Sequence, residues 1–182
     1  MITERHEPLY HISDDPRIAR FEPRPPPSPR PGLDGRMVWA IGERLLHNYL
    51  LPRDCPRVTF YAGAASAPAD VERLLGASGA RHVVAIESRW LAALRAGRLY
   101  QYALPPDTFE LQDAAAGYYI SRAPVLPVAV TPIDDLLGAL LARDVELRVM
   151  PSLWRLHDAV ASSTLQFSII RMRNAQPREQ MT

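Results

Sequence analysis

His11 and Ser13 lie two residues apart in residues 9–13, a short run with the alternating pattern of a β-strand. In a strand, residues i and i+2 project to the same face, so the imidazole and the hydroxyl share a face with Leu9. Polar groups on a face that is otherwise core or cleft need a hydrogen-bond partner or a ligand. The pattern therefore indicates either a binding site at His11 or a core histidine whose neighbours satisfy it.

Two further residues have the chemistry of a reactive group. Cys55 stands in a turn between Arg53 and Arg57, whose positive charges could lower the pKa of its thiol. A lone cysteine without an assigned base is also compatible with an incidental role. Glu87 ends an apolar run just before a predicted helix. It is placed either as a functional carboxylate or as a negative charge at a helix N-terminus.

Several familiar sites are not expected from this sequence. The five histidines are scattered without an i, i+4 pair, and there is one cysteine, so we expect no metal site. The nine glycines form neither a GxGxxG fingerprint nor a phosphate-binding P-loop. No Gly-x-Ser-x-Gly elbow is present, which argues against an α/β-hydrolase.

Composition limits the partners. The 182 residues are 47% hydrophobic and carry a net charge of +1, which favours one domain over 1–182 and makes nucleic acid an unlikely partner. All 21 basic residues are arginine, so arginine or backbone N–H groups would have to hold any anion. No run approaches the ~18 apolar residues of a membrane span, and the first residues lack a signal-peptide pattern. We expect a cytoplasmic protein without a membrane partner.

Short elements are predicted along the chain. Residues 22–36 form a proline-rich loop, either a stiff connection or a segment that offers Arg24 and Arg30 to an anion. Residues 175–182 form a polar tail that we expect to fray. Thr131 as N-cap and Pro132 in the first turn predict a helix over 131–142. Strands are predicted at 9–13, 37–41, 57–62, 82–86, 99–103, 108–112, 117–121, 125–130, 146–150 and 165–170. Without a regular βαβ repeat, these elements predict a mixed α+β fold with two small curved β-sheets and flanking short helices.

Some of these segments resemble a known family. Residues 9–13, followed by the strand with Val38, Trp39 and Ala40, resemble the start of ADP-ribosyltransferase-type domains. Residues 99–102 and 117–124 are similar to strands of the small rifampin-type ADP-ribosyltransferases, and the similar segments cover about a third of the chain. The whole sequence also resembles a bacterial family of undetermined function.

The resemblance implies an ADP-ribosyltransferase-like fold, NAD as substrate and transfer of ADP-ribose to an unknown acceptor. His11 would then hydrogen-bond a ribose hydroxyl, and Trp39 would stack on nicotinamide where a tyrosine is more usual. Arg20 or Arg24 would hold the pyrophosphate. A carboxylate or amide that orients the ribose or acceptor would come from Glu110, Gln112 or Asp113, and the nucleotide contacts would be completed by Tyr10, Ser13 and Tyr119. Hydrolysis of NAD and a noncatalytic binding or interaction domain are the alternatives.

Overall fold

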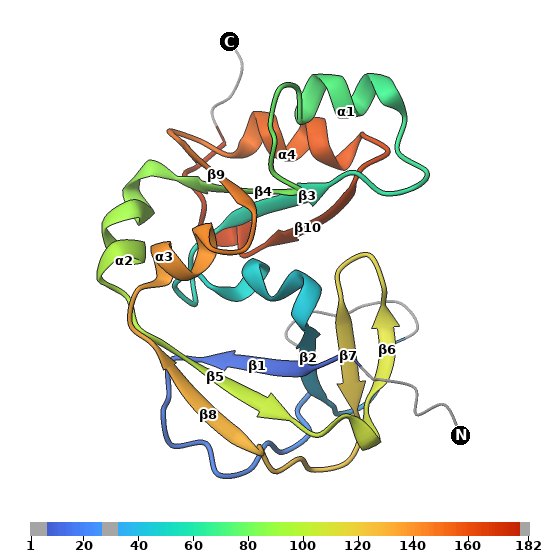
Figure 1. Ribbon diagram of the computed structural model, residues 1–182, viewed down its shortest axis with the longest axis vertical. Helices are drawn as coiled ribbons and strands as arrows, with labels where there is room; N and C mark the ends of the chain where they lie inside the picture. The colour runs from blue at the N-terminus through green and yellow to red at the C-terminus, as the bar shows by residue number, and fades with distance from the viewer. Residues whose placement is uncertain (1–6, 27–32, 179–182) are drawn as a thin grey trace. The chain divides into compact units, whose positions relative to one another are not determined.

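The computed structural model describes residues 7–26 and 33–178, which form two compact units (Figure 1). The first unit combines residues up to Leu46 with Leu99–Ile133, and the second combines His47–Arg98 with residues from Asp134 onward. Each unit has its own β-sheet and the helices are short, which confirms the mixed α+β class. Both units draw on separate stretches of sequence, and the expected single domain over 1–182 stays a prediction.

A six-stranded antiparallel sheet forms the first unit, in the order β6-β7-β2-β1-β5-β8. Its strands are β1 (Leu9–Ser13), β2 (Val38–Gly42), β5 (Leu99–Leu104), β6 (Glu110–Asp113), β7 (Tyr118–Ser121) and β8 (Ala129–Ile133). Alternation along β1 and its neighbours divides their side chains between two faces. The face that carries His11, which we call the His11 face, packs into a core of Leu9, Phe21, Val38, Ala40, Tyr102, Leu104 and Val125.

The second unit is built on a four-stranded mixed sheet in the order β10-β3-β4-β9, in which β4 and β9 are parallel. Its strands are β3 (Arg57–Tyr61), β4 (His82–Glu87), β9 (Val145–Met150) and β10 (Gln166–Ile170). Its α-helices are α1 (Pro68–Leu74), α2 (Leu91–Ala96), α3 (Leu136–Leu141) and α4 (Trp154–Ala161). Leu74 of α1 and Leu156 and Val160 of α4 pack against Val58 and Phe60 of β3.

Four short 3₁₀ helices complete the regular structure, at Glu43–Tyr49, Ser88–Trp90, Pro106–Thr108 and Met172–Asn174. The longest α-helix has eight residues. Across residues 7–26 and 33–178, no helix combines the length and apolar character that crossing a membrane requires.

The prediction for residues 125–142 was wrong. The expected strand over 125–130 and helix over 131–142 are replaced by β8 and by the shorter helix α3. Asp135 is the N-cap of α3, and its side chain accepts a hydrogen bond of 2.8 Å from the Gly138 N–H. The pair Thr131-Pro132 has the composition of a helix start, but Pro132 lies in an edge strand, where its missing N–H costs no ladder bond.

The proline-rich loop and the tail are described in part. Residues 27–32, which include Arg30, lie outside the described residues. Before them, Phe21 bridges to Val125 and Arg24 bridges to Met37 through backbone hydrogen bonds. In the tail that we expected to fray, the Trp154 indole N–H donates to the Gln176 carbonyl, and Arg178 pairs with Asp158. These contacts hold residues 176–178 in place, whereas 179–182 lie outside the described residues.

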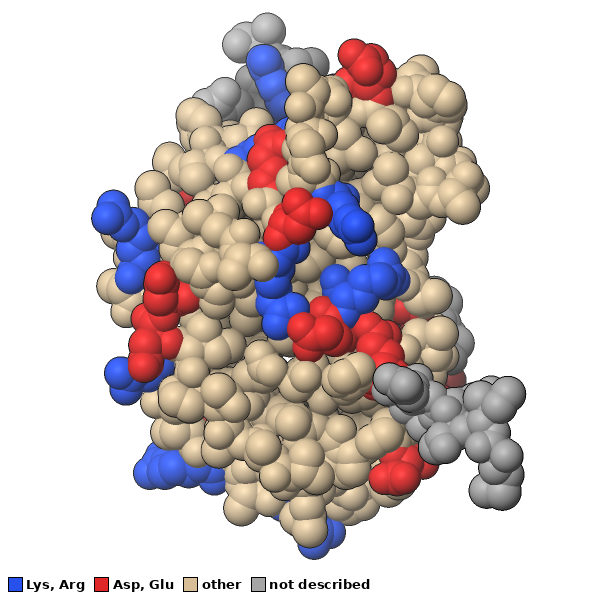
Figure 2. Space-filling view, in the orientation of Figure 1, with Lys and Arg blue, Asp and Glu red and all other residues tan. Residues whose placement is uncertain are grey.

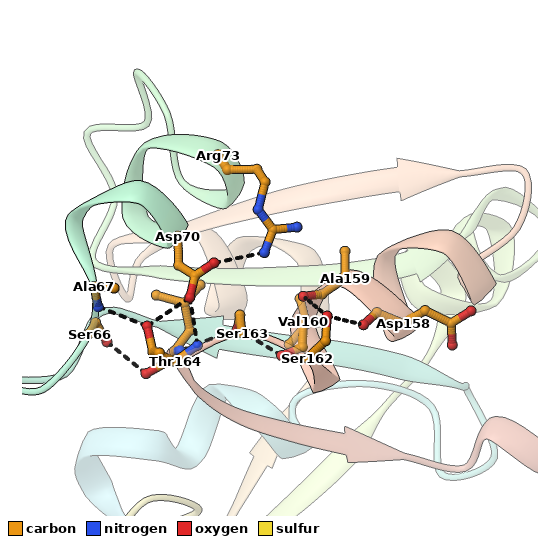
Figure 3. A network of polar contacts seen from close by, with 11 residues as sticks. Ser66, Ala67, Asp70, Arg73, Asp158, Ala159, Val160, Ser162, Ser163 and Thr164 are labelled. Atoms are coloured by element: carbon orange, nitrogen blue, oxygen red, sulfur yellow. Dashed lines mark hydrogen bonds and ion pairs between the residues drawn. The ribbon is translucent and has the colours of Figure 1, made fainter.

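A polar network joins α1 to the turn between α4 and β10 (Figure 3). The Asp70 carboxylate accepts hydrogen bonds from Arg73 at 2.7 Å and from the N–H and O–H of Thr164 at 2.8 Å each. The Thr164 hydroxyl oxygen in turn accepts from the Ala67 N–H. Arg73 first, and then Thr164, lower the pKa of Asp70 from 3.8 to about 2.

We predict that Asp70→Asn lowers the thermal midpoint and weakens the acid dependence of stability. Because the folded-state pKa of Asp70 lies below its value in the unfolded chain, the carboxylate stabilises the fold fully above pH 3.8. This contribution is lost as the pH falls toward 2. Thermal unfolding of both proteins between pH 2 and 7 measures the difference. Glu72→Gln on the same helix, at an exposed position, is the matched control. A difference for Asp70→Asn that does not shrink in acid would contradict the prediction.

Candidate functional site

His11 is held by a hydrogen bond to the neighbouring strand. Its Nδ1 atom lies 3.0 Å from the Trp39 carbonyl oxygen. Because a carbonyl only accepts, we assign the proton to Nδ1, which leaves the acceptor lone pair of the neutral ring on Nε2. The β1–β2 ladder pairs Leu9 with Gly42 and Tyr10 with Ile41, and the imidazole bonds to the β2 backbone beyond that point. This contact fixes the tautomer and orientation of the ring.

Aromatic residues surround His11 on the His11 face. Its ring centroid lies 4.7 Å from that of Phe21, and Phe21 packs edge-on against Tyr102 at 5.3 Å. Tyr102 is also the residue directly opposite His11 in the β1–β5 ladder. His11 is half-buried. The imidazole is therefore part of an aromatic cluster that joins β1 and β5 to the segment containing Phe21.

Tyr102 positions the segment that follows β1. The residue is 1% exposed, yet its hydroxyl donates to the Asp15 carbonyl at 2.6 Å and accepts from the Ile18 N–H at 3.1 Å. Two backbone groups three residues apart are thereby held against one side chain of β5. A buried hydroxyl with both roles satisfied fixes the path of residues 15–18.

A hollow of about 310 Å³ lies beside this hydroxyl, between residues 16–19 and 127–130, with Tyr102 in its wall. We call it the Tyr102 hollow. Its volume is at the lower end of the ~300–1,000 Å³ of ligand pockets, enough for one ring-sized group. Most of the wall residues are apolar, while Arg17 lies at the edge with a side chain that is 87% exposed and whose Nε is 3.6 Å from the Asp15 carboxylate. Such an arrangement suits a flat apolar group linked to an anion.

Three more predicted residues lie on or next to the His11 face, and each has a structural contact. Ser13 accepts a hydrogen bond of 3.1 Å from the Asp15 N–H. Arg20 forms an exposed ion pair with Glu22 at 2.7 Å. The backbone of Arg24 forms a β-bridge with Met37, and Arg24 is exposed. Ser13 thus fixes the backbone at the start of the segment that follows β1. The same segment carries Arg20 and Arg24.

Trp39 does not converge with His11. Its register partner is Ile120, and its ring packs edge-on against Tyr118 at 5.8 Å. It belongs to a cluster with Leu33, Met37 and Ile120 on the sheet face opposite His11. Tyr10 projects to that face as well, because it alternates with His11 along β1. The expected pairing of His11 and Trp39 side chains on one ligand is therefore not seen.

Glu110, Gln112 and Asp113 lie on β6, at the opposite edge of the sheet from β8. β6 is three strands away from β1, about 14 Å at the usual spacing between strands. The Asp113 carboxylate accepts from the Ala116 N–H at 3.0 Å and so closes the turn to β7. These residues are not brought to His11.

Tyr119 bonds to a carboxylate that the sequence analysis missed. Its hydroxyl donates to Glu7 Oε2 at 3.1 Å, and Glu7 Oε1 accepts from the Arg44 N–H at 2.9 Å. Burial first, and then the Glu7 carboxylate, raise the pKa of Tyr119. A Cβ at Gly42 would stand 2.5 Å from Glu7 Oε2, so any larger residue there would displace the Glu7 carboxylate from this position. No local pattern indicated this close approach, because Gly42 was expected to follow the strand over 37–41, whereas it is the last residue of β2.

In the second unit, Cys55 is not activated by the neighbouring arginines, which leaves the incidental role of the two that the sequence allowed. The thiol is 0% exposed, and burial raises its pKa to about 12. The Arg57 charge acts in the opposite direction but is outweighed by burial. A thiol that stays protonated is a poor nucleophile.

Glu87 is a buried anchor. Its carboxylate is 0% exposed and accepts from Arg89 Nε at 2.9 Å. It also accepts from the Gln176 N–H at 2.9 and 3.2 Å. Glu87 is the N-cap residue of the following 3₁₀ helix Ser88–Trp90, the position expected for a charge at a helix N-terminus, but its side chain makes no capping hydrogen bond. Glu87 therefore ties the C-terminal segment to the end of β4.

Charge and metal chemistry add no other site. Acidic and basic side chains are interspersed on the face shown in Figure 2, without a broad area of one sign. Within the described part of the chain, no three histidine, cysteine, aspartate or glutamate side chains are close enough to hold a metal ion.

We predict that Tyr102→Phe loosens residues 15–18. The change removes the acceptor of the Ile18 N–H and the donor to the Asp15 carbonyl, which should cost about 1–2 kcal/mol of unfolding free energy. Denaturant unfolding and limited proteolysis measure the effect. Tyr100→Phe, on the same strand, is the control. Equal stability of the two variants would argue against this role of the hydroxyl.

We also predict that Cys55 is inert in the folded protein. At pH 8, a chromogenic aromatic disulfide should react with the native thiol about a hundredfold or more slowly than with the urea-unfolded chain, because only the thiolate attacks. Comparable rates in the two states would show that the thiol is accessible.

Comparisons with known proteins identify a family but no activity. No curated protein matches the chain, and no solved structure matches it. The sequence profile of DUF6886, described as a family of unknown function, matches residues 10–175, which include both units and every predicted site residue. The chain therefore belongs to the DUF6886 family.

Proposed function

We propose that the first unit binds a small-molecule nucleotide, with NAD as the leading candidate, on the His11 face. The observation that carries this proposal is the Tyr102 hollow, an apolar site with Arg17 at its edge. His11 lies directly opposite Tyr102 on the adjacent strand. One wall residue of the hollow thus neighbours the residue that the resemblance to ADP-ribosyltransferases assigns to the ribose, although His11 itself is not part of the wall.

The three parts of a dinucleotide fit different features of this face. The hollow takes one flat ring, nicotinamide or adenine, against apolar walls. Arg17 and Arg20, on the segment held by Tyr102, offer guanidinium groups to the pyrophosphate. His11, whose ring is oriented by the contact of Nδ1 with the Trp39 carbonyl, is the residue that the resemblance assigns to a ribose hydroxyl.

Transfer of ADP-ribose is the reaction that the resemblance implies for a bound NAD. The bond between nicotinamide and ribose breaks, nicotinamide leaves with the electron pair, and an acceptor or water bonds to the ribose carbon and loses a proton. Such chemistry needs a negative or polar group near that carbon. The carboxylates expected for this role lie three strands from β1. Binding is thus better supported than catalysis, and a noncatalytic binding domain is the alternative.

We predict that millimolar NAD raises the thermal midpoint by several degrees, and that His11→Ala and Arg17→Ala abolish the shift while the variants stay folded. A ligand at 100 times its Kd adds roughly 2.7 kcal/mol to the unfolding free energy. His157→Ala and Arg95→Ala, in the second unit, are the matched controls and should keep the wild-type shift.

The outcomes separate the parts of the proposal. No shift in the wild-type protein would contradict nucleotide binding. A shift that both variants retain would place NAD elsewhere. Chromatography that measures released nicotinamide distinguishes a transferase or hydrolase from a domain that binds NAD without turnover.

A further inference from the structure

The two sheets have four edge strands, and β8 differs from the other three. β6 carries Glu110 and Asp113, and β9 carries Glu146 and Arg148. Charged side chains on these two edge strands disfavour pairing with another chain. β10 has no charge but is largely half-buried or buried. Four of the five residues of β8 are exposed, and none is charged. β8 is therefore the edge best suited to pair with another chain.

The backbone of β8 shows which groups face outward. Tyr100 pairs with Pro132, which has no N–H, so this pair cannot exchange ladder hydrogen bonds. Hydrogen-bonded and non-hydrogen-bonded pairs alternate along an antiparallel ladder. The hydrogen bonds between β5 and β8 are therefore made by Thr131 and by the residues two positions before and after it. Val130, between them, directs both its N–H and its C=O away from β5. The open edge thus offers one donor and one acceptor at a single residue.

Residues on either side of Val130 present no further donor. Two positions later, Pro132 lacks an N–H. Two positions earlier, the Val128 N–H donates to the Ala103 carbonyl at 2.9 Å, although Ala103 pairs with Ala129. At Val128 and Pro132, the outward-facing positions on either side of Val130, no backbone N–H is left that would need a new acceptor.

Apolar side chains lie along the same edge. Leu126 is 63% exposed, Val128 69% and Val130 48%. From 123 to 133 the sequence contains no charged residue. A second chain that approached here would lose the exposure of these side chains without meeting a charge.

We propose that this edge takes a second copy of the chain, with the two β8 strands antiparallel and Val130 facing Val130. The pair would exchange two N–H···O bonds. At the flanking positions, Pro132 of one copy would face Val128 of the other, so pairing would bury no N–H without an acceptor. A two-fold symmetric contact uses the same groups on both chains, as isologous dimers do. Val128 and Val130 also line the Tyr102 hollow, so the experiments below are made without nucleotide and test strand pairing alone.

The short edge sets the strength of the contact. A stable interface buries about 800 Å² per partner, more than five residues of one strand provide. We therefore expect a weak dimer with a Kd on the order of 100 µM.

Sedimentation velocity of the full chain between about 5 µM and 1 mM tests the proposal, because it spans the expected Kd. The wild-type protein should shift from monomer to dimer. Val130→Glu should stay monomeric, because two carboxylates would meet at the symmetry axis. Val149→Glu is the matched control: it places the same charge on β9, at a valine 40% exposed, and should dimerise like the wild type. A monomer throughout, or a dimer that Val130→Glu leaves intact, would overturn the proposal.

A cross-linking experiment is independent of whether Val130→Glu folds. In an antiparallel pair centred on residue 130, the facing Cα atoms are about 5.5 Å apart, within the range of a disulfide. Mild oxidation should therefore convert Val130→Cys to a covalent dimer, whereas Val149→Cys should give none above background. Cys55 is buried and does not compete. Equal cross-linking of both variants would show random collision and would also overturn the proposal.

Discussion

The full antiparallel pairing of β1 with β5 is the constraint on which the first unit depends. It places His11 opposite Tyr102 and so decides which side chains share a face. Tyr102 then uses its buried hydroxyl to hold residues 15–18, and Phe21 packs against both rings. A shift by one residue would exchange the two faces and separate the hydroxyl from the segment that it holds. Tyr102 thereby holds residues 15–18 beside β5, and residues 16–19 form one wall of the hollow.

The same alternation explains why the expected catalytic group is not assembled. His11 and Trp39 were both expected to meet one ligand, but their register partners assign them to opposite faces. What links them is the hydrogen bond from the imidazole to the Trp39 backbone. A histidine used in this way has one nitrogen committed to structure. The hydrogen bond holds the imidazole in one orientation against the β2 backbone.

Much of the fold was predictable, because alternation of apolar residues is a local signal. Residues 9–13, 57–61 and 82–86 were expected as strands and lie in β1, β3 and β4. The site was less predictable because it depends on distant pairs. Nothing local to Tyr102 indicates that Asp15 and Ile18 will bond to its hydroxyl, 84 or more residues away. Cys55 shows the same limit: its neighbours in sequence are arginines, but burial by distant residues controls its pKa.

Pro132 is compatible with two different structures, the start of a helix and an edge strand. After Thr131 it has the pattern of a helix start, since a helix leaves its first N–H groups unpaired. An edge strand also leaves every second N–H unpaired, and proline is tolerated there for the same reason. The local sequence cannot separate the two, because both depend only on the absent donor. The difference comes from β5, whose register with residues 129–133 makes this segment a strand. Once it is a strand, the proline limits pairing at the open edge to Val130, so the edge can admit one short partner strand but cannot template a continuous sheet.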